Sequence, residues 1–213
     1  MATGSYKERL TARFLGQHEL LQRTSHLLAR HAAYLRTGAD LDEALLHQFL
    51  HFFRSFLLDH QDLEESRLFP WLNRHGVSQS PLAKLLEEHM QARRDLEGLA
   101  RAVEGMIESH GADSDRETYA RLAEEFALAL AAHDWKENHI LYPLADLIDV
   151  DEELLARGDE DQDWTMDEEE SRRWVEDVEA LALNWPAPAV NLPHTRIAGG
   201  PAPAGPNDPG EER

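Results

Sequence analysis

The sequence predicts an all-α fold, an up-down-up-down four-helix bundle followed by one extra C-terminal helix and a disordered tail. Apolar residues recur with helical spacing over four long segments, and each segment ends at a helix-stop signal. No segment alternates apolar and polar residues as a half-buried strand would. The connections between the four segments are short, so consecutive helices are expected to run antiparallel.

The first two helices are expected over residues 5–36 and 42–75. The first ends before Gly38, because glycine accepts the left-handed conformation that closes a helix. The second carries Pro70 near its end, where proline predicts a kink or an early end of the helix. The apolar stripes of these two helices consist of Leu10, Phe14, Leu21, Leu28 and Leu35, and of Leu46, Phe49, Phe53, Phe56 and Leu57.

The third and fourth helices are expected over residues 80–110 and 114–148. Ser80 and Pro81 read as an N-cap and a first-turn proline. Ser114 is expected to cap the fourth helix and to form a capping box with Glu117. Pro143, like Pro70, lies near the end of its helix and again predicts a kink or an early end.

The chain divides into three parts by composition. Residues 1–148 form the bundle, residues 149–185 an acidic linker with a further helix over 166–184, and residues 186–213 a disordered tail rich in proline and glycine. The Asp167–Glu170 run reads as the solvated start of that further helix.

Composition excludes several functional classes. The chain has 41 acidic and 21 basic residues, and this acidity disfavours nucleic-acid binding. It has no cysteine, so disulfides, iron–sulfur clusters and thiolate zinc sites are excluded. No signal peptide and no membrane-spanning apolar stretch occurs, so we expect a cytoplasmic protein with no membrane partner.

An internal repeat carries the candidate chemistry. HQDLEESRLFP at residues 60–70 and HDWKENHILYP at residues 133–143 share histidine, glutamate, leucine, aromatic and proline at matching places. His18 and His89 each precede one copy by a similar distance. The chain therefore reads as two helical hairpins, each with a lone histidine on its first helix and His-x-x-x-Glu on its second.

This spacing favours a metal site. Residues i and i+4 share one face of a helix, so each His-x-x-x-Glu pair can direct a nitrogen and a carboxylate at one point. Four imidazoles and two carboxylates from four helices suit two iron ions, with manganese or zinc as alternatives. The candidate metal ligands are His18, His60, Glu64, His89, His133 and Glu137.

A structural explanation competes with this one. A lone buried histidine is more often a hydrogen-bonded core residue than a ligand, and a single His-x-x-x-Glu is weak evidence. The duplication and the apolar neighbours at helical spacing favour ligands. Supporting or solvated roles are expected for Glu65, Glu87 and Glu88, and surface positions for His26 and His139. The histidines without a repeat partner, which we do not assign to the site, are His31, His47, His51, His75 and His110.

The motifs resemble the hemerythrin-like, or HHE cation-binding, family over roughly residues 10–148. The resemblance rests on His18, on the two repeats, and on Glu88-His89. It implies a four-helix bundle with an oxo- or hydroxo-bridged di-iron site held by the six candidate ligands. Arg93 stands four residues after His89, where oxygen-carrying members have a further histidine, so the pattern is more similar to that of reactive or sensing members.

Three functions are the resulting hypotheses. The first is a di-iron protein that binds or senses dioxygen, peroxide or nitric oxide. The second is a di-iron enzyme with peroxidase, catalase-like or nitric-oxide-reducing activity. The third is an iron-responsive binding module, in which the acidic C-terminal region with Trp164, Trp174 and Trp185 docks a protein partner. The alternative for that region is a solubilising appendage that packs one helix on the bundle.

Overall fold

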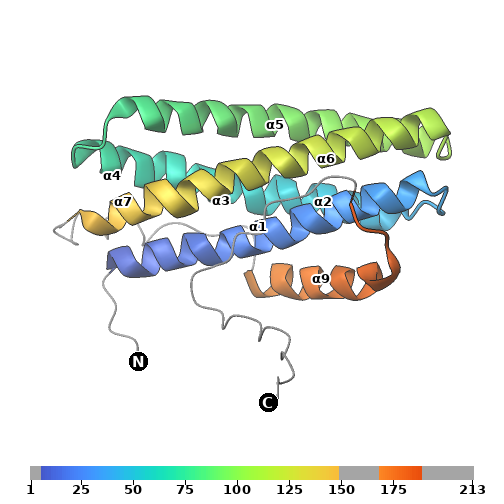
Figure 1. Cartoon of the computed structure of the whole chain (residues 1–213), viewed down its shortest axis with the longest axis horizontal. Helices are drawn as coiled ribbons and strands as arrows, with labels where there is room; N and C mark the ends of the chain where they lie inside the picture. Colours follow the sequence, from blue (N-terminus) through green and yellow to red (C-terminus); the bar gives the residue numbers. More distant parts are fainter. Residues whose placement is uncertain (1–5, 149–167, 189–213) are drawn as a thin grey trace, which may run out of the picture.

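The computed structural model describes residues 6–148 and 168–188, which are helical apart from short loops and include no strand. Four antiparallel helical rods form the bundle, and a fifth helix lies along one side of it (Figure 1). The rods are α1 (Tyr6–Arg36), a second rod over residues 43–74, α5 (Gln79–Glu108), and a fourth rod over residues 113–147. The predicted fold class is confirmed. The predicted linker over residues 149–165 and the tail from residue 189 lie outside the described residues.

Two of the rods change helical pitch along their length. The second consists of α2 (Glu43–Phe52), a π-helical turn (Phe53–Leu57), α3 (Leu58–Leu63), a second π turn (Glu64–Leu68) and α4 (Phe69–Arg74). The fourth consists of α6 (Asp113–Lys136), a π turn (Glu137–Leu141) and α7 (Tyr142–Leu147). A π turn adds one residue to a helix, and such turns are frequent at functional sites.

The two prolines explain where two of these turns lie. In each rod the π turn starts at the motif glutamate and ends just before an aromatic residue and a proline. The backbone N–H of Phe69 donates to the carbonyl of Glu64, five residues earlier, and Tyr142 donates to Glu137 in the same way. This wider turn relieves the clash of the proline ring with the preceding carbonyls, so the helices continue. Of the kink or early end expected at Pro70 and Pro143, the early end does not occur, because each rod continues as a helix beyond its π turn.

The helix starts differ in detail from the prediction. α1 ends at Arg36, and Gly38 has a positive φ of 82°, as expected. α5 begins at Gln79, so Ser80 lies inside the first turn and Ser78 precedes the helix without a side-chain cap. Pro81 is tolerated as the third helical residue because its missing N–H would have had no partner there.

The prediction of a capping box between Ser114 and Glu117 at the start of the fourth helix is wrong. α6 begins at Asp113, after Ala112, and no side chain caps it. Glu117 instead accepts two hydrogen bonds from Arg36, at 2.8 and 3.0 Å. A bidentate pair with an arginine is the stronger interaction for this carboxylate.

Two clusters make up most of the apolar core of the described residues, apart from a small contact between Ala29 and Ala127. The larger one joins the C-terminal half of α1 to α2, to the C-terminal half of α5 and to the N-terminal half of α6. The smaller one, around Phe14, Trp71, Leu82 and Tyr142, joins the other ends of the rods. Along every rod the candidate histidines fall between residues of the two clusters, so a buried polar layer crosses the bundle there.

The fifth helix, α9 (Glu168–Leu181), with a 3₁₀ turn (Ala182–Asn184), packs on α1 and α2 (Figure 1). Trp174 stacks on Phe52 at 5.2 Å between ring centroids and donates its indole N–H to Gln48. Val175 and Val178 are buried in the larger cluster. The predicted extra helix is present over these residues, and in the described ranges no helix is long and apolar enough to cross a membrane.

Candidate metal centre

Six buried side chains converge in the polar layer, and we call them the six-residue centre. They come from all four rods, and each is at most 6% exposed. The structure therefore brings together every residue that the sequence singled out as a candidate ligand. These residues are His18 of α1, His60 of α3, Glu64 and Glu137 at the starts of their π turns, His89 of α5 and His133 of α6.

The centre contains two groups of four, each with its ligand atoms within 4.8 Å of one another. Position A comprises His18 and His60 with the two glutamates, and position B comprises His89 and His133 with the same glutamates. Glu64 and Glu137 belong to both groups, so each carboxylate can bridge the two positions. This is the arrangement that a duplicated His-x-x-x-Glu hairpin predicts.

The histidines point their Nε2 atoms inward in pairs. The Nε2 atoms of His18 and His60 are 2.8 Å apart, and those of His89 and His133 are 3.0 Å apart. Two nitrogens bound at right angles to one ion, each at about 2.1 Å, lie about 3 Å apart. Both pairs therefore have the spacing of two ligands that share a cation.

The opposite nitrogen of every ring is held by a side-chain oxygen. In position A, Nδ1 of His18 donates to Asn138 at 2.7 Å and Nδ1 of His60 donates to Gln17 at 2.9 Å. In position B, Nδ1 of His89 donates to Glu65 at 2.8 Å, and Nδ1 of His133 donates to Glu88 at 3.1 Å.

These bonds fix the tautomer of each ring. With the proton on Nδ1, a neutral ring presents the lone pair of its Nε2 to the interior, as a metal ligand must. Two such lone pairs at 2.8 to 3.0 Å repel each other unless a proton or a cation lies between them.

Three of the four carboxylate oxygens of the centre lack hydrogen-bond partners. Oε2 of Glu64 and both oxygens of Glu137 are buried without a hydrogen bond. Glu137 reaches toward both positions, with Oε2 at 3.3 Å from Nε2 of His18 and Oε1 at 3.2 Å from Nε2 of His133. Buried carboxylate oxygens are costly without a donor or a cation, so these three atoms define where positive charge is needed.

The pKa values of His18 and Glu64 are shifted in the direction expected for a centre that lacks positive charge. Burial alone would lower the pKa of His18, but Asp134, Glu137 and Glu64 raise it to about 9. Burial and the charge of Glu137 raise the pKa of Glu64 well above its usual range. The carboxylates of this layer therefore carry negative charge that needs a counter-charge. Without a cation, protons on the histidine rings and on Glu64 must supply it.

Several contributing residues were not predicted from the sequence. The hydroxyl of Tyr142 donates to Oε1 of Glu64 at 2.5 Å, while Asp134 is buried with an unpartnered Oδ2. Gln17 and Asn138 also hold rings, and they occupy the places in their hairpins that Glu88 and Glu65 occupy in the other copy. The repeat therefore offered a signal for both, as it did for Tyr142, which occupies the aromatic place that Phe69 fills in the first copy. The supporting roles expected for Glu65 and Glu88 agree with their bonds to His89 and His133, whereas Glu87 is exposed.

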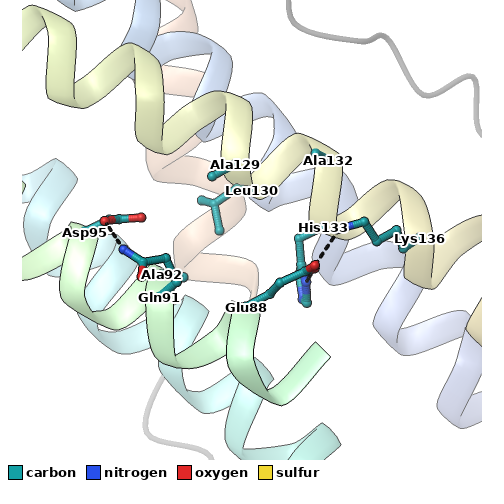
Figure 2. A pocket seen from close by; sticks show the side chains of 9 residues that line it. All are labelled: Glu88, Gln91, Ala92, Asp95, Ala129, Leu130, Ala132, His133 and Lys136. Atoms are coloured by element: carbon teal, nitrogen blue, oxygen red, sulfur yellow. Dashed lines mark hydrogen bonds and ion pairs between the residues drawn. The ribbon is translucent and has the colours of Figure 1, made fainter. Parts of the chain in front are cut away.

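A groove between α5 and α6 reaches position B. It has a volume of about 230 Å³, an apolar floor that includes Ala92 and Leu130, and Gln91 and Asp95 at its rim (Figure 2). His133 lines it beside Glu88, whose Oε1 accepts from Lys136 at 2.7 Å. Figure 2 shows the Glu88 carboxylate between the His133 ring and Lys136.

The other histidines lie outside the centre. His139 is exposed and stacks on Trp135, as expected for a surface residue, and His26 is partly exposed. His31 differs, because it is 2% exposed and its Nδ1 lies 3.0 Å from the hydroxyl of Tyr119. The sequence offered no repeat partner for it, and the structure places it against the larger apolar cluster, beside Phe49.

Comparison with known proteins gives one match. The model of the hemerythrin HHE cation binding domain matches residues 9–145, which span all four rods and all six residues of the centre. No curated protein and no solved structure matches the chain.

Proposed function

The chain belongs to the hemerythrin HHE cation-binding domain family, and from that premise we propose that its six-residue centre binds two iron ions. We propose further that the protein uses them to bind or sense dioxygen, peroxide or nitric oxide. Four imidazoles and two carboxylates are donors that iron accepts, and manganese or zinc could occupy the same ligands.

The observation that carries the proposal is the set of unpartnered atoms. Three buried carboxylate oxygens and four inward-facing ring nitrogens meet in one layer without enough donors among them. A structural core histidine would have its partners satisfied by the protein. Two cations would satisfy both the oxygens and the ring lone pairs.

The protein would supply positioning and exclusion of water. Glu137 would bridge the two positions through its two oxygens, and the four Nδ1 bonds would keep the rings in place. The two apolar clusters on either side of the layer would limit access of water. When bound, a ferrous pair supplies two electrons that a small oxidant can accept.

Elemental analysis of protein purified without added metal tests the proposal. We expect about two irons per chain in the wild type and less than one in Glu137→Gln. Glu124→Gln is the matched control, because Glu124 is another buried glutamate of the fourth rod but pairs with Arg36. Stoichiometric zinc, or no metal in the wild type, would overturn the assignment to iron.

Turnover of peroxide or nitric oxide is the second candidate function. It is favoured by the groove at His133 and by Arg93, which is engaged outward with Asp62 and Glu65 and adds no ligand. Six protein ligands for two ions leave coordination positions open to a substrate. Catalytic consumption of either compound by the iron-loaded chain, lost in Glu64→Gln, would distinguish an enzyme from a binding protein.

An iron-responsive module that docks a partner through its acidic C-terminal region is the third candidate. Trp174 and Trp185 lie against the bundle, which favours the packed appendage for residues 168–188, whereas Trp164 lies outside the described residues. A partner that binds the iron-loaded chain but not a chain ending at Ile148 would support the module. The cytoplasmic location stays a prediction that cell fractionation would test.

A further inference from the structure

We propose that the two positions of the centre differ, so that position B takes up the first cation and holds it more tightly than position A holds the second. This inference rests on the proposed function, since it requires that the six residues bind two ions. Three independent features of the structure favour the same order of loading.

The first feature is the type of side chain that accepts the hydrogen bond from Nδ1 of each histidine. Both position B histidines donate their Nδ1 protons to carboxylates, Glu65 and Glu88, whereas both position A histidines donate to neutral amides. A carboxylate acceptor makes the inward nitrogen more basic and a better ligand than an amide acceptor does.

Other charges moderate this difference without reversing it. Arg93 pairs with Glu65 at 2.9 Å and Lys136 pairs with Glu88 at 2.7 Å, but these cations are 31% and 41% exposed and are screened by water. The buried carboxyl of Asp134 interacts with both His18 and His133, and more strongly with His18, so it offsets part of the difference in favour of position A.

The second feature is that the two copies of the repeat carry different aromatic residues at the matching place, Tyr142 in one and Phe69 in the other. The hydroxyl of Tyr142 donates to Oε1 of Glu64 at 2.5 Å and lies 3.3 Å from Nε2 of His18, in position A. At the matching place in the first copy, Phe69 stacks its ring on His89 at 5.6 Å and offers no polar atom.

This leaves Glu64 with one free oxygen. Its Oε2 lies 3.4 Å from Nε2 of His60 and 3.5 Å from Nε2 of His89, so a single atom serves both positions. A cation in position A would compete with the Tyr142 hydroxyl for the other oxygen of Glu64. A cation in position B meets no such competitor.

The third feature is access. The groove between α5 and α6 ends on His133, and the acidic side chains of Glu88 and Asp95 line it (Figure 2). Aromatic rings pack around position A, where Phe14 lies edge-on against His60 and face to face with Tyr142. The groove therefore brings solvent and two carboxylates up to the His133 ring of position B.

Anaerobic titration of the metal-free full chain with Co²⁺ tests the order of loading, with calorimetry and visible absorption as readouts. We expect two steps whose dissociation constants differ by about tenfold or more. His133→Ala should abolish the tight step, whereas His60→Ala should abolish the weak step and leave the tight constant within about threefold. Two steps of equal affinity in the wild type would overturn the inference.

Matched substitutions test the cause. Glu65→Gln with Glu88→Gln turns both carboxylates into amides and should weaken the first step about 10- to 100-fold while the second changes far less. Tyr142→Phe, which removes only a hydroxyl, should lower the dissociation constant of the second step. The two dissociation constants should then differ less than in the wild type. Phe69→Tyr is the reciprocal substitution. It adds a hydroxyl beside His89 of position B and should weaken the first step.

The outcomes separate this inference from the proposed function. If the wild type binds no Co²⁺ at these residues, the proposed function itself fails. If it binds two equivalents, but the carboxylate substitutions weaken both steps equally or Tyr142→Phe leaves the second unchanged, only the inference fails. Circular dichroism of each metal-free variant checks that it folds. The wild-type titration shows whether the two affinities differ even where a variant does not fold, and the folded variants assign the tight step to position A or position B.

Discussion

Two regions of the bundle bury histidines to a similar extent but shift their pKa values in opposite directions. His31 lies under Trp185, 5.1 Å away between ring centroids, with the hydroxyl of Tyr119 at its Nδ1. Burial lowers its pKa to about 4. His18 is just as buried, but the acidic groups around it, Asp134 foremost, raise its pKa to about 9 against the effect of burial.

The difference shows that burial of a histidine does not identify a metal ligand. Around His31 the described contacts are a hydroxyl and aromatic rings, and Trp185, which follows α9 and its 3₁₀ turn, covers the region. Around the six-residue centre, carboxylate oxygens are left without partners. The His31 region therefore depends on its own packing, whereas the centre, under the proposed function, depends on a cation.

Removal of the metal should give the largest effect and should be confined to the centre. At a free metal concentration about 1,000 times the dissociation constant, binding adds about 4 kcal/mol to the free energy of unfolding. We expect that loss on chelation, measured by denaturant titration. Hydrogen exchange should accelerate around residues 60–68 and 133–142 more than in α9. Uniform acceleration along the chain would contradict the division into two regions.

Acid should destabilise the His31 region in a defined window. The folded protein holds His31 neutral with a pKa of about 4, whereas in the unfolded chain its pKa has the ordinary value of 6.5. Between these values only the unfolded state binds the proton, so the free energy of unfolding falls as pH falls from 6.5 to 4, by up to about 3 kcal/mol.

A double variant isolates this contribution from that of other acidic groups. His31→Leu with Tyr119→Phe removes both polar partners, so neither is left unpaired. Its free energy of unfolding, measured in metal-free protein, should fall less than that of the wild type between pH 6.5 and pH 4. Parallel pH profiles would show that His31 titrates normally.

Loss of Trp174 should weaken the packing of α9 and leave the centre intact. Trp174→Ala removes a half-buried ring that stacks on Phe52, and we expect a loss of about 2 kcal/mol with unchanged metal content. Trp135→Ala is the control, because Trp135 is 45% exposed and should cost less than about 0.5 kcal/mol. A loss of metal in Trp174→Ala would mean that the two regions are coupled.

The ion pair between Arg23 and Glu179 should have the smallest effect. Both side chains are partly exposed, at 26% and 41%, so water screens the two bonds that join α1 to α9. Glu179→Gln should lower the free energy of unfolding by less than about 1 kcal/mol, with the difference shrinking at high salt. A larger loss would show that charge, more than Trp174, holds α9 in place.

Sequence alone predicted the rods and the six-residue centre because periodicity and a duplicated motif are local patterns. It did not predict Gln17 or Asn138, which reach their histidines across the bundle from another rod, because amides stand there where the other copy of the repeat has the carboxylates of Glu88 and Glu65. It misplaced the fourth helix start because Arg36, a residue distant in sequence, takes the carboxylate of Glu117. The burial of His31 was not predicted because it depends on Trp185 and Tyr119, which are distant in sequence.

The π turns at residues 64–68 and 137–141 set the rotational phase of α4 and α7. Each residue of a helix turns the chain by about 100°, so the added residue rotates Phe69 and Tyr142 by that angle relative to an uninterrupted helix. Deleting one residue within either turn would carry the aromatic ring away from its histidine while keeping the helix. The number of residues between each glutamate and its proline is therefore as much a part of the centre as the ligands themselves.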